Sequence, residues 1–280
     1  METVNSLSGG KTSSYLAIHH PADHELFALV CNDDPKCAHP DKKIMQRAND
    51  KLSKYTPHMG EFIGTPEHIS IIQIMFDLEQ VLGREIKWLR GRSFDDLIKW
   101  KSAVPNQNAR WCTTFMKLDP IFWYCYLHTE FPVDMRIGFR YDELERADRL
   151  TTEYKIPNDC NNFGEHRQNW KTFVDWRIGS FPLIDDKITN YQVSQFWKDK
   201  GFTFPEDSNC QNCFWKHEQQ LRKNFDSAPN VMQWAKEKEQ DTGTRLRHKM
   251  TLERIEKIGL QQEFSFGGGS GCQADGFCTD

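Results

Sequence analysis

A glycine-rich loop near the amino terminus is the first group of residues in this sequence that could do chemistry. It follows a β-prone stretch, Thr3–Leu7, and precedes a segment with a helical pattern. A loop in this position directs backbone N–H groups and the positive end of a helix toward phosphate, and a lysine adds a point charge. The pattern S-G-G-x-x-S is complete in Ser8, Gly9, Gly10, Lys11, Thr12 and Ser13. We expect a phosphate site here; the alternative is a turn that only connects a strand to a helix.

The longer phosphate loop, G-x-x-x-x-G-K-[ST], fits this segment less well. Gly10, Lys11 and Thr12 match its end, but its first glycine would fall on Asn5, inside the expected strand. The chain could not wrap around phosphates there in the usual way. The sequence therefore argues against a Walker-type kinase.

The cysteines form a second candidate site. Nine cysteines in a chain without an export signal should stay reduced, which favours metal or catalytic chemistry over disulfides. Cys210 and Cys213 form a C-x-x-C pair, which is half of a metal site. Cys272 and Cys278 follow a glycine tract with little apolar surface, so a metal could fix that tail by binding one of them. Four thiolates suit a [4Fe–4S] cluster or zinc, and the alternative is an incidental pair beside a disordered tail.

Several charged side chains could bind a ligand. Arg140 follows an expected strand and could offer a planar fork to phosphate or sulfate. Asp33 ends another strand and could contact a ribose or a metal, but it equally suits the start of a loop. Arg146 could bind an anion or simply pair with Glu143. A basic strip near the C-x-x-C pair could face nucleic acid or only solvent: Lys216, His217, Arg222, Lys223, Arg245, Arg247, His248 and Lys249.

Strands that alternate with helices must position these groups. Over residues 1–140 the alternation predicts an α/β fold with a doubly wound, mostly parallel sheet, in which ligands bind at the carboxyl ends of strands. The expected strands are Thr3–Leu7, Leu26–Cys31, Ile86–Leu89, Val133–Phe139 and Lys171–Ile178. The expected helices are Ser13–His20, Pro40–Tyr55, Pro66–Leu82, Ser93–Trp100, Ala109–His128 and one from Thr189 to Gly201.

The last part of the chain changes character. We expect a nucleotide-binding domain over residues 1–200 and a smaller, helical, cysteine-bearing region over 201–280. Two charged helical stretches fall in that region, His217–Phe225 and Asn230–Ile258.

Four segments in a fixed order resemble a known family. The loop Ser8–Ser13 resembles the PP-loop of the adenine nucleotide alpha-hydrolase superfamily. Arg110–Lys117 (RWC…K), Gly138–Arg146 (G-x-R-x-D-E…R) and Pro182–Ile184 before a helix resemble the phosphoadenosine phosphosulfate (PAPS) reductase-like branch. The resemblance implies a Rossmann-like fold that binds ATP or a related adenine nucleotide, with the loop, Asp33 and Arg140 as contacts.

The same resemblance assigns the cysteines. In the iron–sulfur subgroup the RWC cysteine, here Cys112, joins a later C-x-x-C, which implies a [4Fe–4S] cluster on Cys112, Cys210, Cys213 and either Cys272 or Cys278. Zinc is the alternative metal. The implied activity is that of a sulfurtransferase or a sulfonucleotide reductase-like enzyme, acting in sulfur transfer or in nucleotide or nucleic-acid modification. The alternative is a nucleotide-binding partner protein with a structural metal site and no turnover.

Two departures from the family pattern narrow the activity. ATP-cleaving members carry S-G-G-x-D-S, whose aspartate helps to hold magnesium, and Thr12 stands at that position here. Magnesium-assisted release of pyrophosphate is therefore in doubt. The end of the chain also lacks the E-C-G-L-H-type segment of true sulfonucleotide reductases, so ordinary PAPS reduction is not expected.

Composition excludes other classes of protein. The chain has 280 residues, 38% of them hydrophobic, and carries nine tryptophans, which is enough for a substantial core. No apolar run reaches the length of a membrane helix, and the first residues do not resemble a signal peptide, so we expect a cytoplasmic protein without a membrane partner. The net charge of −4 marks no general nucleic-acid binder, although a local basic patch, a nucleic-acid or protein acceptor and oligomers stay open.

Overall fold

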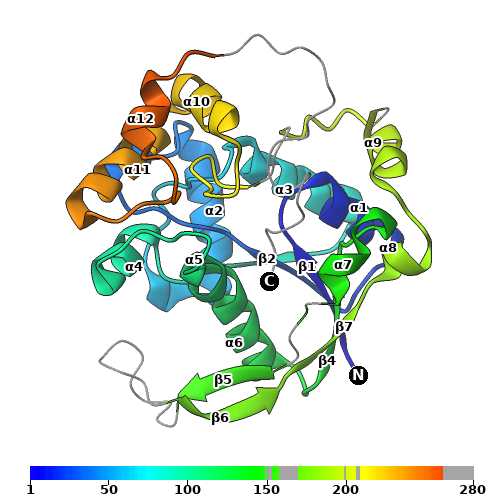
Figure 1. The fold of residues 1–280 in the computed structure, drawn as a ribbon. Helices are drawn as coiled ribbons and strands as arrows, with labels where there is room; N and C mark the ends of the chain where they lie inside the picture. Colours follow the sequence, from blue (N-terminus) through cyan, green and yellow to red (C-terminus); the bar gives the residue numbers. More distant parts are fainter. Residues whose placement is uncertain (149, 151–152, 158–169, 199, 206–208, 261–280) are drawn as a thin grey trace.

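A five-stranded parallel sheet forms the centre of the computed structural model, which describes residues 1–148, 150, 153–157, 170–198, 200–205 and 209–260, with backbone only at 153–157 and 170–173. Its strand order is β3-β2-β1-β4-β7, and every neighbouring pair is parallel (Figure 1). The order reverses between β1 and β4, because the chain builds outward from β1 to β3 and then returns to the other side. The strands are β1 (Thr3–Leu7), β2 (His24–Ala28), β3 (Ile86–Leu89), β4 (Val133–Ile137) and β7 (Arg177–Ser180).

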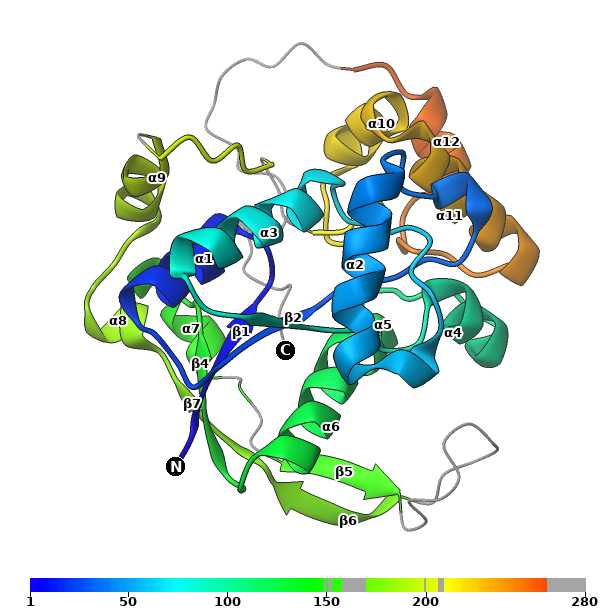
Figure 2. The same ribbon diagram turned by 180° about the vertical axis from the view of Figure 1, so that it is seen from behind.

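Helices cover both faces of this sheet (Figure 2). Leu26 and Phe27 are neighbours in β2 and pack into different cores, because successive side chains of a strand point to opposite faces. One core holds residues of α1 (Lys11–His19), α2 (Lys42–Tyr55), α3 (Ser70–Leu82) and α9 (Asn190–Lys198), and the other holds α6 (Asp119–His128). The α/β class with a parallel sheet is confirmed.

The helices after residue 201 share a core with an early helix. Leu221, Trp234 and Ile255 pack with Phe94 and Leu97 in a third cluster of buried residues. The Trp234 indole N–H also donates a hydrogen bond of 3.0 Å to the Asp95 carboxylate. These helices are α4 (Phe94–Lys101), α10 (Glu218–Ser227), α11 (Pro229–Thr242) and α12 (Leu252–Lys257).

Short elements complete the chain. The helical ones are η1 (Pro35–Cys37), η2 (Pro57–Met59), α5 (Trp111–Thr113), the π turn η3 (Thr114–Leu118), η4 (Tyr141–Glu143), α7 (Leu144–Ala147) and α8 (Pro182–Asp185). Strands β5 (Glu153–Pro157) and β6 (Trp170–Asp175) form an antiparallel pair that the sequence did not predict. The single strand expected over 171–178 is therefore wrong: it divides into β6 and β7.

Two helix predictions are wrong in instructive ways. The helix expected from Pro66 begins only at Ser70, because the Thr65 hydroxyl accepts from the Glu67 amide and Glu67 turns into the interior. The helix expected over 230–258 is two helices, α11 and α12, because the chain turns at Gly243, where φ is +64°. The buried Glu239 carboxylate then accepts from backbone amides on both sides of the connecting loop.

In the part of the chain that the structure describes, no helix is long and apolar enough to cross a membrane.

Candidate functional site

A cavity lies at the carboxyl ends of β1 and β4, where the strand order reverses. Ligands of parallel α/β sheets bind at this kind of position. Its wall contains most of the predicted phosphate loop together with the predicted arginine: Ser8, Gly10, Lys11, Thr12, Ser13 and Arg140. Asp33 is not part of its described wall; that carboxylate lies 3.4 Å from Arg90 Nη2 instead.

Glycines and serines give the loop its shape. Gly9 has a φ of +72°, and a Cβ there would lie 2.4 Å from Cγ2 of Ile71, so only glycine fits. The Ser13 hydroxyl accepts from the Ser8 amide at 3.2 Å and closes the loop. A Cβ at Gly138 would lie 3.3 Å from the Ser13 backbone, so the end of β4 and the start of α1 approach closely. The first amides of α1 have no acceptor within the helix, which leaves them available to an anion in the cavity.

The cavity wall is strongly positive. Five cations line it, against one carboxylate, Glu143, although the chain as a whole has a net charge of −4. Arg140 is buried and donates a hydrogen bond of 3.0 Å to the Thr12 hydroxyl, while Arg146 pairs with Glu143. This wall suits a ligand that carries several negative charges. The five cations are Lys11, Lys117, Arg140, Arg146 and Arg177.

Lys117 connects the cavity to a buried carboxylate. Its ammonium group donates a hydrogen bond of 3.0 Å to Glu67, whose side chain is 1% exposed. Burial raises the pKa of Glu67, and the charge of Lys117 opposes that rise. Burial also lowers the pKa of Lys117, but the negative charges of Glu67 and of a Cys210 thiolate raise it by more. Lys117 is therefore a positive charge held between the cavity and the interior.

Three of the predicted cysteine ligands lie close enough for their charges to interact. Burial raises the pKa of the Cys112 thiol to about 12, and the nearby charge of Cys213 adds to the rise. Burial likewise raises the pKa of Cys210, with further contributions from Glu67, Cys213 and Cys112. Cys112 and Cys210 are nearly a hundred residues apart in the sequence, so it is the fold that brings these thiols together.

The loop that carries Cys210 and Cys213 is fixed by hydrogen bonds. The Cys213 amide donates to the Cys210 carbonyl at 3.0 Å, and the Gln211 amide donates to the Pro66 carbonyl at 2.6 Å. The Asn224 side chain donates to the Gln211 carbonyl, also at 2.6 Å. Within the described residues, no three His, Cys, Asp or Glu side chains are arranged to hold a metal ion. Cys272 and Cys278, the expected source of a fourth ligand, lie outside the described residues.

A π turn follows Cys112 and contains Lys117. It covers Thr114–Leu118, while Cys112 lies in α5 (Trp111–Thr113), and a π turn is closed by bonds from residue i to residue i+5. The charges of Cys112 and Lys117 are close enough to interact. A Cβ at Gly91 would lie 2.1 Å from the Phe115 carbonyl oxygen, so the loop after β3 packs directly against this turn.

Sequence reasoning missed three residues of the site. Lys117 ends the RWC…K segment and could have been found from that position. Glu67 was hidden because Thr65-Pro66-Glu67 resembles the start of a helix. Arg177 enters the cavity wall from β7, and no local pattern marks it.

Comparison with known proteins assigns no family. No protein-family model and no solved structure matches the chain. A curated protein that it resembles is the uncharacterized protein MJ0973 of Methanocaldococcus jannaschii, with 27% identity over 157 residues. That match covers 55% of this chain and 33% of the relative, so the chain matches about a third of the relative's length.

Proposed function

We propose that the cavity at β1 and β4 binds an adenine nucleotide, with its phosphates on the Ser8–Ser13 loop and Arg140. The loop amides and the five cations support a polyanionic ligand. The choice of adenine comes from the resemblance of four segments to the PAPS reductase-like branch, which also implies a Rossmann-like fold. Free cysteines in the described chain are in keeping with a cytoplasmic protein.

One observation carries the proposal further. Lys117 lines the cavity, and its charge also interacts with the thiols of Cys112 and Cys210. A nucleotide in the cavity would thus be separated from the thiols by a single side chain. We infer an enzyme of sulfur transfer, or of nucleotide or nucleic-acid modification, rather than a carrier of nucleotide alone.

The thiols suit a thiolate-bound metal centre. Desolvation is the main cause that raises the pKa of the half-buried Cys112 and Cys210, and the charges of neighbouring cysteines add to it; binding to a cation would favour the thiolates. Cys112, Cys210 and Cys213 would hold a [4Fe–4S] cluster, with zinc as the alternative, and Cys272 or Cys278 would complete the set. If only the three described cysteines held it, a [4Fe–4S] cluster would supply one iron with an open position that can bind sulfur. Lys117 and the loop amides would hold the charge of the nucleotide.

Nucleotide binding is tested by removing Arg140. We expect Arg140→Ala to weaken ATP binding about 10–100-fold, because a hydrogen bond to a charged group contributes roughly 1.5–3 kcal/mol. Titration calorimetry measures the affinity. Arg92→Ala is the matched control, since Arg92 lies outside the described cavity wall and contacts Asp96 and Trp100 of α4. Equal affinity of the wild type and Arg140→Ala would contradict the site.

Thr12 leads to a second expected result. Its hydroxyl accepts from Arg140, so a guanidinium group stands where ATP-cleaving relatives use a carboxylate for magnesium. The protein alone should release little pyrophosphate from ATP and Mg²⁺. Thr12→Asp should not create this activity, because the new carboxylate would pair with Arg140. A coupled pyrophosphate assay measures both proteins, and rapid stoichiometric release by the wild type would show the argument to be wrong.

The hydrogen bond between Arg140 and Thr12 also favours a second candidate function. Because Thr12 offers no carboxylate for magnesium, the protein could hold ATP without turnover, as a nucleotide-binding partner protein with a structural metal site. Adding candidate sulfur acceptors to the pyrophosphate assay distinguishes the two functions, because only the enzyme would then consume nucleotide.

A further inference from the structure

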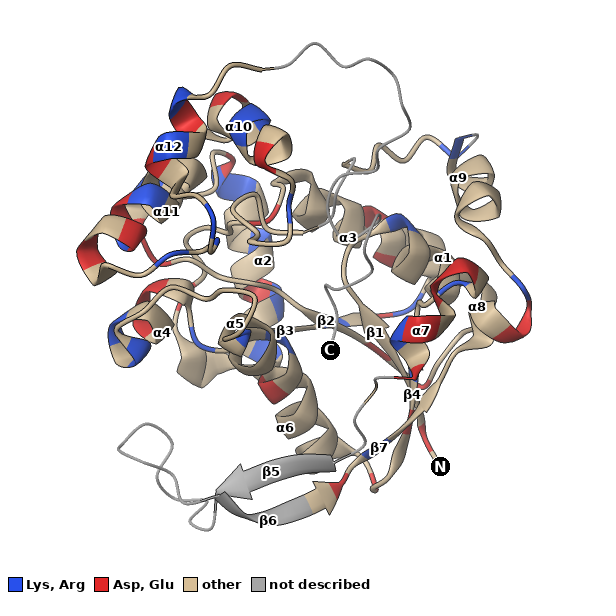
Figure 3. Ribbon diagram, in the orientation of Figure 1, with Lys and Arg blue, Asp and Glu red and all other residues tan. Residues whose placement is uncertain are grey.

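Three segments beside the cysteine loop carry only positive charge. Residues 99–117, 209–217 and 243–251 contain eight Lys or Arg and no Asp or Glu, in a chain whose net charge is −4. We refer to these three segments as the basic surface. Figure 3 shows Lys and Arg at the end of α4 and along the loop between α11 and α12, which belong to it.

Direct contacts join the three segments to one another. The Val104 amide donates to the Thr244 hydroxyl at 2.9 Å, which links the first segment to the third. Arg247 donates to the carbonyl of Phe214 at 3.2 Å, which links the third to the second. The Arg110 guanidinium lies 5.9 Å from the centre of the Trp215 ring, which links the second to the first. The three segments therefore lie against one another.

Much of this charge is open to solvent. Lys99, Lys101, Arg245 and Lys249 are exposed, as are His217 and His248. Three carboxylates near these segments have cationic partners: Glu218 with Arg247, Asp96 with Arg92, and Asp95 with Lys238. Asp241, just before the third segment, is exposed. Because the segments themselves contain no carboxylate, a partner with regularly spaced negative charge would meet more attraction than repulsion here.

The basic surface also carries planar aromatic, guanidinium and amide groups. Trp100 is 45% exposed, and the Lys101 ammonium lies 3.6 Å from its ring centre. The pair of Arg110 and Trp215 is a second cation–aromatic contact. Exposed amides of Gln107 and Asn108 lie on the turn between the two pairs in the sequence. Unstacked bases bind to aromatic and guanidinium planes and to amides, whereas an acidic peptide needs only the charge.

We propose that the basic surface binds a single-stranded stretch of nucleic acid. The inference rests on the proposed function in one respect: it identifies the strand as the acceptor of that chemistry, because Cys112, Cys210 and Cys213 lie in the same segments as the cations. The cations contact the phosphates, and Trp100 contacts a base. RNA and DNA share this chemistry, and the experiment distinguishes them.

The test measures binding of a short fluorescein-labelled strand, prepared as RNA, as DNA and as each duplex, by fluorescence anisotropy over a range of salt. We expect the single strands to bind more tightly than the duplexes. The triple variant Lys99→Ala/Lys101→Ala/Lys249→Ala should bind about 10–100-fold more weakly at 0.1 M salt, with the slope of log affinity against log salt reduced by about 2. Trp100→Ala should weaken binding about tenfold without changing that slope.

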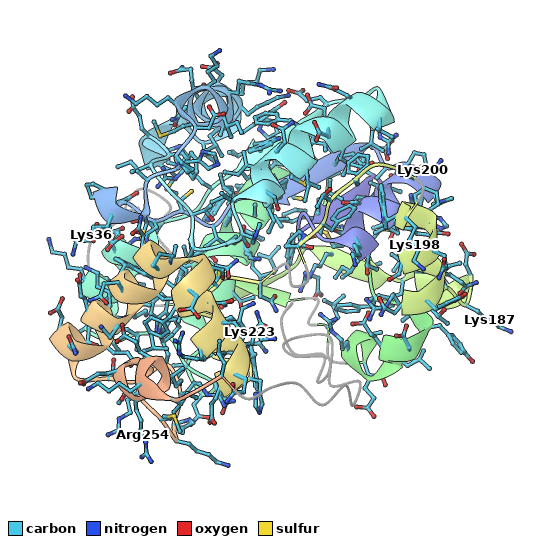
Figure 4. The ribbon with its side chains drawn as sticks, turned by 90° about the horizontal axis from the view of Figure 1, so that it is seen from above. Lys36, Lys187, Lys198, Lys200, Lys223 and Arg254 are labelled. Atoms are coloured by element: carbon cyan, nitrogen blue, oxygen red, sulfur yellow. The ribbon has the colours of Figure 1, made fainter. Side chains whose placement is uncertain are left out.

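The matched control removes the same number of charges elsewhere. Lys187, Lys198 and Lys200 are exposed and project on the α9 side of the molecule, away from α10 and α12 (Figure 4). Their triple alanine variant should bind the strand like the wild type. Equal losses in the two triple variants, tighter binding of duplexes, or competition by polyglutamate as strong as by RNA would each overturn the proposal.

Two further measurements separate this inference from the proposed function. The Lys99/Lys101/Lys249 variant should keep its ATP affinity and its metal content, because none of the three residues lines the described cavity. Strand binding in a protein that holds neither ATP nor metal would refute the proposed function alone. ATP and metal binding without strand binding would refute the basic surface alone.

Discussion

Lys117→Met is expected to destabilise the fold by about 3–5 kcal/mol, because it leaves Glu67 buried without its partner. The Glu67 side chain is 1% exposed, and within the described structure its second oxygen has no hydrogen-bond partner. Urea unfolding followed by circular dichroism measures the change. Lys51→Met is the matched control, since its partner Glu79 is partly exposed, and it should cost at most about 1 kcal/mol.

The loss of folding stability in Lys117→Met should depend on pH in a defined direction. Burial raises the pKa of Glu67 in the folded protein, and removing Lys117 raises it further. An acid with a raised folded pKa binds its proton more tightly when folded, so stability falls as pH rises from the unfolded pKa of about 4.3 through the folded pKa. The variant should therefore recover part of its stability on acidification toward pH 5. Adding Glu67→Gln to Lys117→Met should remove this dependence on pH. If Lys117→Met were no less stable than Lys51→Met, the buried ion pair would be contradicted.

Replacing Cys112, Cys210 or Cys213 by serine is expected to abolish the metal centre. Protein purified without oxygen should contain iron and sulfide and absorb visible light, and each of these variants should lose both. Cys125→Ser is the matched control, because Cys125 is also a free thiol but is buried in the core under α6. Wild-type protein with zinc in place of iron would select the alternative metal. Wild-type protein with neither, or equal loss in Cys125→Ser, would reject the site.

The cysteine variants should also separate the two halves of the site. Cys213→Ser should loosen the region around α10–α12 and leave ATP binding intact, because the sheet and α1 have cores of their own. Calorimetry with ATP and limited proteolysis measure the two effects. Cys272→Ser and Cys278→Ser should differ from one another in metal content, since one of them is expected to be a ligand.

Local patterns predicted the first part of the site. The bounds of β1 were correct, and the glycine loop falls between β1 and α1 as expected. These elements depend on alternation of apolar residues and on glycines whose conformation no other residue adopts, such as Gly9. Arg140 was found for a similar reason, because it follows the end of a strand, where side chains reach the ligand edge of the sheet.

The second part could not be predicted in this way. A regular helix over 109–128 would place Cys112 and Lys117 about 140° apart, since each residue turns the helix by about 100°. The π turn departs from this regular geometry and packs closely against Gly91, a contact that no single-sequence pattern reveals. Glu67 was hidden for a related reason: its partner is fifty residues away.

The core that α4 shares with α10–α12 sets an order for synthesis on the ribosome. Phe94 and Leu97 leave the exit tunnel long before Leu221, Trp234 and Ile255, with which they pack. At about 5–20 residues per second, roughly 6–25 seconds pass before Leu221 is made and roughly 8–32 seconds before Ile255. Throughout that interval α4 can pack only against earlier members of the cluster, such as Val30, Cys37 and Met116. A chaperone that binds nascent apolar segments would protect it, and the C-x-x-C loop would reach Cys112 only after most of the polypeptide has emerged.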